Sequence, residues 1–279
     1  MQRTLTPRSM QPATAAWRAF AGHWPEYAME AAGLGLFMVC ACLFVALFEY
    51  PGSPLRPLLP DGLTRRALIG IAMGLTAIAL IRSPWGRRSG AHLNPAVTLT
   101  FLRLRKIAAP DAVFYVLAQC AGAIGGVLLA GLVLGPMVIA DPGVAHVFTL
   151  PGPGGPYIAW IAEAAISFGL MFIVLVVSNR PALNRFTALV AGTLVAVYIT
   201  VEAPLSGMSM NPARTLGSAV SAHDWTAFWV YLTAPPLGML LAAETYVRRF
   251  GLRRVLCAKL DHSAGSRCIF RCRFDHDDR

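Results

Sequence analysis

Residues 89–98 read SGAHLNPAVT, and residues 206–215 read SGMSMNPART. The two segments carry Ser, Gly, Asn, Pro, Ala and Thr at matching positions, and Asn94 and Asn211 stand 117 residues apart. Asn is a strong helix N-cap, Pro suits the first turn of a helix, and the residues that follow in both segments are compatible with a helix. The sequence therefore predicts two equivalent loops, each leading into a short helix.

The composition around these segments is typical of a membrane protein. Of the 279 residues, 56% are hydrophobic and only 14% are charged, which is too apolar for an ordinary soluble surface. Blocks close to the ~20 apolar residues that a spanning helix needs recur along the chain. They lie at residues 28–48, 67–81, 112–139, 157–177, 186–201 and 225–243. We expect six spans, the first of them retained and not cleaved as a signal sequence.

The basic residues follow the connections between these blocks. The net charge is +10, and Arg and Lys gather before the first block, after the second, after the fourth and after the sixth, whereas residues 135–156 contain none. The positive-inside rule then places both termini on the cytoplasmic side. This pattern also argues against nucleic acid as a partner, because the charges follow membrane topology and form no single basic stripe.

The placement of the two segments predicts an inverted repeat. Each follows the second span of a three-span half, so the first enters from the cytoplasmic side and the second from outside. A helix of two or three turns cannot cross the bilayer, so both re-enter and their N-termini meet near the midplane. We expect residues 27–250 to form one channel domain, with halves 27–139 and 157–250, between an N-terminal segment 1–26 and a tail 251–279.

Such a meeting point suits a small neutral solute. The side-chain amides of Asn94 and Asn211 supply donors, while the two positive helix ends oppose cations and protons. Arg214 adds a fixed guanidinium beside the second motif. Glu30 and Glu163 lie within apolar blocks, where a carboxylate faces protein or water. The expected fold is an all-α membrane protein with six transmembrane helices and two re-entrant half-helices.

The paired motifs resemble those of the major intrinsic protein family, the aquaporins and glycerol facilitators, over about residues 26–249. The resemblance implies a right-handed bundle with one pore per subunit, a homotetramer, and a multi-pass location in the cell membrane. It also implies that Glu30 and Glu163 brace the re-entrant loops by accepting hydrogen bonds from their amides. The pore motif residues it implies are Asn94, Pro95, Ala96, Asn211, Pro212 and Ala213.

The resemblance further implies an outer constriction that sets selectivity. The matching positions are Met73, Ile199, Met208 and Arg214. Gly74 is the alternative to Met73 on the second span. Strict water channels usually have His where Ile199 stands, so this position differs from theirs. Glycerol facilitators usually have Asp where this chain has Thr215, so that position differs from theirs. Taken together the residues favour water, with glycerol or another small neutral solute as the alternative. His92 and Met210, just before the two Asn residues, are second-rank pore candidates, with packing as their other role.

Other classes of protein fit less well. An ion-coupled secondary transporter also uses inverted repeats and broken helices, but carboxylates placed to bind a coupling ion are scarce in these spans. No nucleophile, acid–base pair or set of metal ligands converges at one depth of the spans, so neither an enzyme nor a cofactor is expected.

The tail contains Cys257, His262, Cys268, Cys272 and His276. These residue types bind zinc, but their spacing matches no strong finger pattern. The sequence therefore favours a solvated basic tail with no metal site, whose positive charge suits anionic lipid headgroups.

Overall fold

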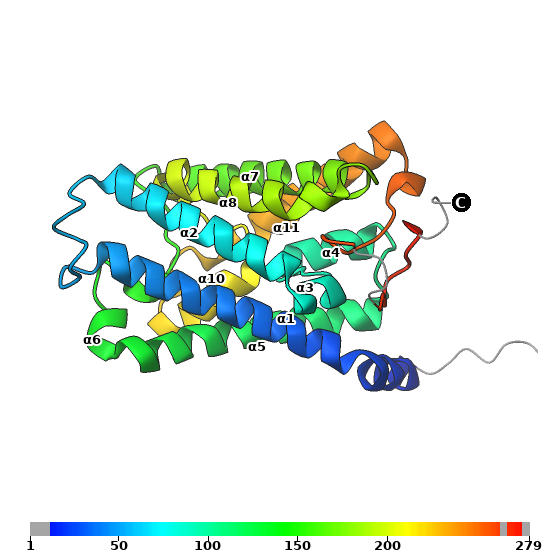
Figure 1. Ribbon diagram of the computed structural model, residues 1–279, viewed down its shortest axis with the longest axis horizontal. Coiled ribbons are helices and arrows are strands. Elements are labelled where there is room, and N and C mark those ends of the chain that lie inside the picture. The colour runs from blue at the N-terminus through cyan, green and yellow to red at the C-terminus, as the bar shows by residue number, and fades with distance from the viewer. Residues whose placement is uncertain (1–11, 263–266, 275–279) are drawn as a thin grey trace, which may run out of the picture.

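The computed structural model describes residues 12–262 and 267–274, and within these ranges the chain forms helices and no strands. The long helices are α1 (Pro12–Glu49), α2 (Gly62–Arg82), α5 (Ala109–Leu134), α7 (Gly155–Ser178), α8 (Thr187–Val201) and α11 (Phe228–Phe250). The shorter ones are α3 (Pro84–Ser89), α4 (Pro95–Arg103), α6 (Pro136–Ile139), α9 (Ala203–Ser206), α10 (Pro212–Ala222) and the 3-10 turns η1 (Ala145–Val147), η2 (Asn184–Phe186) and η3 (Leu252–Arg254). Figure 1 shows the long helices running along the molecule, with α4 and α10 among them.

Six long helices form the bundle in the described part of the chain. Five of them, α1, α2, α5, α7 and the segment Asn184–Val201 that contains α8, are long and apolar enough to cross a membrane. The sixth, α11, is long enough but less apolar, since Pro235 and Pro236 lie inside it and Arg248 and Arg249 end it. It packs along α7 and completes the bundle.

Two helix boundaries differ from the limits of the apolar blocks in the sequence. The third apolar block, 112–139, is not one helix, because α5 ends at Leu134. Gly135 has a φ of 83°, a left-handed value that L side chains rarely adopt, and Pro136 then begins the separate short helix α6. At the other end of the molecule, α1 begins at Pro12, well before its apolar block.

The two halves make equivalent contacts. Helix α1 packs on α5 as α7 packs on α11, α10 contacts α5 as α4 contacts α11, and the equivalent helices α2 and α8 pack against each other. Small residues permit these close approaches: a Cβ built on Gly126 would lie 2.3 Å from the Gly35 carbonyl oxygen, and one on Gly238 would lie 2.3 Å from that of Ala164. The chain thus forms an inverted repeat about a common centre.

Helix α2 begins with a side-chain cap at the end of the connection from α1. The Asp61 carboxylate accepts hydrogen bonds from the Thr64 amide and hydroxyl, both at 2.7 Å. Both bonds lower the pKa of Asp61, and the bond from the Thr64 hydroxyl has the larger effect. The cap fixes the N-terminal end of the helix that carries Met73.

Candidate functional site

The two re-entrant loops have the same backbone conformation. Short helices α3 and α9 end at Gly90 and Gly207, which adopt left-handed φ values of 95° and 79°. Left-handed residues follow at Ala91 and Leu93 in the first loop and at Met208 and Met210 in the second. Such values cost a non-glycine residue about 1–2 kcal/mol each, so the surrounding structure must hold both loops in place.

Glu30 holds the first loop. Its carboxylate accepts hydrogen bonds from the backbone amides of His92 at 3.0 Å and Leu93 at 2.6 Å, from the Ser89 hydroxyl at 2.7 Å and from the Gln119 amide at 2.8 Å. The side chain is fully buried. A buried carboxylate with this many donors is compensated for its lost hydration, and it ties α1 to the loop.

Glu163 holds the second loop in the same way from α7. Its carboxylate accepts hydrogen bonds from the Ser209 amide at 2.6 Å, the Met210 amide at 2.7 Å and the Ser206 hydroxyl at 2.8 Å. The loop also accepts a hydrogen bond at its Ser206 carbonyl from the Tyr231 hydroxyl, at 2.6 Å.

The corresponding bond in the first loop runs from the Tyr115 hydroxyl to the Ser89 carbonyl, also at 2.6 Å. Each re-entrant loop is therefore held by a buried glutamate of a long helix and by a tyrosine, and in the second loop the Ser206 hydroxyl also contacts the carboxylate of Glu202.

The asparagines of the two motifs cap the half-helices. Asn94 Oδ1 accepts a hydrogen bond from the Ala96 amide at 2.8 Å, and Asn211 Oδ1 accepts from the Ala213 and Arg214 amides at 3.1 and 3.2 Å. Each oxygen is thus used by its own helix, so the side-chain Nδ2 groups face away from the helix and remain available as donors.

One hydrogen of each Nδ2 group joins the two half-helices. Asn94 Nδ2 donates to the Met210 carbonyl, and Asn211 Nδ2 donates to the Leu93 carbonyl, each at 2.7 Å. Since an amide nitrogen has two hydrogens, each asparagine keeps one donor beyond this reciprocal link. Both side chains line the same cavity, so a solute there meets two amide donors.

The cavity has a volume of about 410 Å³ and is lined mainly by apolar atoms. Its lining includes Glu49 and Pro142 at the end of the bundle where α1 ends, and Ile81 and Val174 near the opposite end. A cavity that meets residues from both ends of the bundle, with the two half-helices in between, is the path of a pore.

The four constriction candidates lie on this cavity. Met73, Ile199, Met208 and Arg214 all contribute to its lining. Gly74 faces α8, because a Cβ built there would lie 2.5 Å from the Gly192 carbonyl oxygen. Arg214 is the polar member, and its Nη1 is buried with no hydrogen-bond partner among the described residues.

The second-rank candidates also line the cavity, and His92 has a packing role as well. Its Nε2 donates to the Ala258 carbonyl at 2.9 Å, and its ring stacks on Phe101 and Phe270 at centroid distances of 5.1 and 5.4 Å. Met210 contributes from the second loop. Two of the partners of His92 therefore come from the C-terminal segment.

The expectation of a solvated tail is wrong for residues 255–260, all of which are buried. The Leu256 amide donates to Asn179 Oδ1 at 2.6 Å, the Leu260 amide donates to the Gly90 carbonyl at 3.1 Å, and Lys106 Nζ donates to the Leu256 carbonyl at 3.1 Å. Burial lowers the pKa of Lys106. Backbone groups of the tail thus find partners on the loops of the bundle, which the residue types alone do not indicate; His276 lies outside the described residues.

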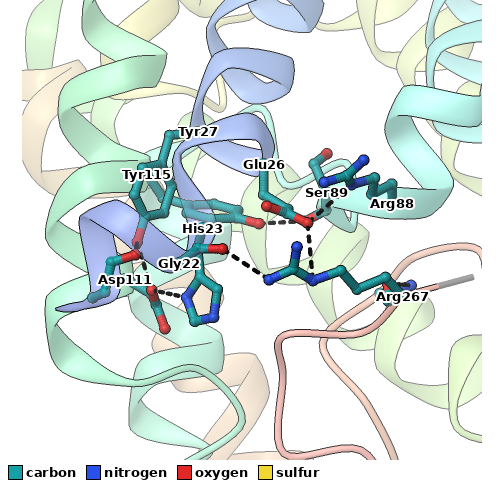
Figure 2. A network of polar contacts seen from close by, with 11 residues as sticks. Gly22, His23, Glu26, Tyr27, Arg88, Ser89, Asp111, Tyr115 and Arg267 are labelled. Atoms are coloured by element: carbon teal, nitrogen blue, oxygen red, sulfur yellow. Dashed lines mark hydrogen bonds and ion pairs between the residues drawn. The ribbon is translucent and has the colours of Figure 1, made fainter.

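Beyond residues 263–266, the segment reaches α1. Figure 2 shows Arg267 beside the polar groups of that helix. Its Nη2 donates to the Gly22 carbonyl at 2.8 Å, and its Nε lies 3.8 Å from Glu26, which also pairs with Arg88 at 3.0 Å. The C-terminal segment is therefore attached at several points around the end of the bundle where α1 begins.

A bundle of six helices whose two half-helices meet at one cavity defines a passive membrane channel for water or other small uncharged solutes. The chain belongs to the major intrinsic protein family, whose model matches residues 17–246.

Two relatives and one solved structure illustrate the relationship. Aquaporin-4 of Mus musculus is 35% identical over 237 residues, covering 82% of this chain and 69% of that protein. Aquaporin NIP6-1 of Arabidopsis thaliana is 37% identical over 182 residues, covering 64% of this chain and 57% of that protein. The X-ray structure of the aquaglyceroporin from Plasmodium falciparum shares the fold, with a TM-score of 0.63 at 22% identity over 80% of this chain and 95% of that one.

Proposed function

We propose that this chain is a water channel that excludes ions and protons. The observation that supports it most directly is Arg214, whose guanidinium lines the cavity with Nη1 buried and unpartnered among the described residues. The Arg214 side chain as a whole is only half-buried, so its other guanidinium donors can hydrogen-bond the oxygen of a passing solute. Together with the N-termini of α4 and α10, the same fixed charge opposes cations and protons.

The constriction we propose consists of Met73, Ile199, Met208 and Arg214. Three apolar side chains facing one guanidinium let a water molecule hydrogen-bond on one side and offer little on the other. Such a wall also suits the carbon backbone of a polyol, so a glycerol or small neutral solute facilitator is the second candidate. The flexible thioether side chains of the two methionines favour this second candidate, since they adapt to a larger solute.

Stopped-flow light scattering on proteoliposomes separates the two candidates. For the wild type we expect fast osmotic water flow and glycerol entry close to that of protein-free vesicles. Arg214→Ala should raise glycerol entry about tenfold, since removing about 1.4 kcal/mol from a barrier has that effect. Arg103→Ala is the control, because Arg103 is half exposed in an ion pair with Glu244. Fast glycerol entry by the wild type would replace the water channel with the facilitator.

We further propose a homotetramer in the cell membrane with both termini in the cytoplasm. Large apolar side chains such as Leu117, Leu132, Tyr157 and Ile161 are exposed on the outside of the bundle, and lipid or a second copy of the chain must cover them. Native mass spectrometry from detergent should give four chains per particle, and a single chain under mild conditions would contradict the assembly.

A further inference from the structure

Four potential metal ligands of the C-terminal segment converge although they are spread over 16 residues of sequence. They are Cys257, His262, Cys268 and Cys272, and their ligand atoms all lie within 4.8 Å of one another. Cys257 Sγ is 3.6 Å from Cys268 Sγ, and Cys272 Sγ is 3.1 Å from His262 Nε2. We propose that this cluster binds one Zn²⁺ and that the ion fastens the C-terminal segment over the cytoplasmic mouth of the pore.

The distance between the Cys257 and Cys268 sulfurs fits a tetrahedral ion better than a disulfide. With zinc–sulfur bonds of about 2.3 Å, two thiolates of a tetrahedral site stand about 3.8 Å apart, close to the 3.6 Å between Cys257 and Cys268. A disulfide would require about 2.05 Å between the sulfurs. Three thiolates and one imidazole are also a recognised structural zinc set, and they leave no position open for catalysis.

The surroundings suit the charge of such a site. Three thiolates and one Zn²⁺ leave one net negative charge, and the ammonium of Lys106 interacts electrostatically with Cys257 and Cys272. Lys106 Nζ also donates to the carbonyls of Leu256, at 3.1 Å, and Arg271, at 3.2 Å, each adjacent to a ligand in the sequence. The loop between the half-helix α4 and α5 therefore supports both sides of the cluster.

The ligands bracket the residues that contact the pore. Cys257 and His262 flank residues 258–260, in which the Ala258 carbonyl accepts from His92 and Leu260 lines the cavity. Cys268 and Cys272 flank Phe270, whose ring stacks on that same histidine. One ion joining the four ligands would thus hold both contacts against the first re-entrant loop.

Metal analysis of the purified full-length chain in detergent tests the site. After incubation with Zn²⁺ and removal of excess, we expect about one zinc per chain for the wild type and for Cys120→Ser, a cysteine of α5 away from the cluster. Cys272→Ser and His262→Ala should each retain less than about a tenth of that. Co²⁺ in place of zinc should give the visible absorption of a tetrahedral thiolate site in the wild type and in Cys120→Ser, but not in Cys272→Ser or His262→Ala.

Three results would overturn the site: a folded wild type without zinc, variants that keep the full zinc content, or a Cys257–Cys268 disulfide in peptides mapped without reduction. The fastening is tested by trypsin. Lys259 is only 2% exposed, so cleavage after it should be slow with zinc and fast after chelation. Equal cleavage rates would contradict the fastening whether or not zinc binds.

The effect at the mouth rests on the proposed function and is measured separately. In proteoliposomes, chelation should raise water flow severalfold, because Leu260 is released from the cavity wall. Unchanged flow through an active channel would contradict a role at the mouth. No flow with or without zinc would count against the proposed function and leave the zinc content of the chain as an independent result.

Discussion

Glu30 and Glu163 each hold several donors of a strained loop, and neither has an oxygen to spare. Changing either to Gln replaces one acceptor oxygen by a donor that faces backbone amides. We expect each change to lower the free energy of unfolding by about 3 kcal/mol, which is the scale for hydrogen bonds to a buried charged group. Thermal unfolding in detergent should show a drop of several degrees for both variants. Glu244→Gln is the matched control. Glu244 forms a half-exposed ion pair with Arg103, and losing that pair should lower the free energy of unfolding by less than about 1 kcal/mol.

Ile199 is a constriction candidate on α8 that takes no part in the hydrogen bonds holding the two re-entrant loops. It lines the cavity from α8, and its substitution by Trp adds a large rigid ring to a narrow space. Water flow through Ile199→Trp should fall at least about tenfold, while the unfolding temperature changes little. Val197→Trp is the control, because Val197 is half exposed on the outer side of the same helix. Equal loss in both variants would count against a path past Ile199.

At the scale of elements, α1 and α5 depend on one face of small residues. A Cβ on Gly126 would meet the backbone of Gly35, whereas a Cβ on the adjacent Gly125 meets nothing within 4 Å. Gly126→Ala should therefore destabilise the protein by about 2 kcal/mol or more. Gly125→Ala should be neutral or stabilising by up to about 1 kcal/mol, since Ala is the better helix former. Thermal unfolding compares the two variants. Similar changes in unfolding temperature would mean that α1 and α5 pack less closely at Gly126 than described.

The sequence predicts the elements well where one local signal is strong. The caps at Asn94 and Asn211 and the long apolar blocks indicate both half-helices and the bundle. The sequence predicts helix boundaries poorly where apolar residues continue past a break in the helix, as at Gly135. The bracing tyrosines, Tyr115 and Tyr231, carry a weak signal: they stand 116 residues apart, nearly the spacing of the motifs, but a tyrosine hydroxyl has no visible partner until the loop is folded.

At the scale of the whole molecule, the two halves predict opposite orientations for the two loops and the same side for both termini. Green fluorescent protein fused after Arg279 should fluoresce, whereas alkaline phosphatase fused at that place should be inactive because it folds only outside the cytoplasm. Alkaline phosphatase fused after Gly143, in the connection free of basic residues, should be active. The reverse pattern would contradict the proposed orientation.

The tail shows what a linear sequence conceals at this scale. Its Cys and His residues match no regular finger spacing, so the sequence indicates a solvated segment. In the folded chain, the backbone amides of Leu256 and Leu260 donate to Asn179 Oδ1 and to the Gly90 carbonyl, on loops more than 70 residues away. Contacts of that range depend on the finished bundle, and no local periodicity encodes them.

The central claim is that solute crosses the protein through the cavity between the two half-helices. Its most direct test is osmotic water flow in proteoliposomes, comparing the wild type, Ile199→Trp and protein-free vesicles with no ion gradient present. The account predicts wild-type flow well above that of protein-free vesicles and flow near the protein-free value for Ile199→Trp. Water flow equal to that of protein-free vesicles and no entry of any small neutral solute, with the protein folded and inserted, would contradict it.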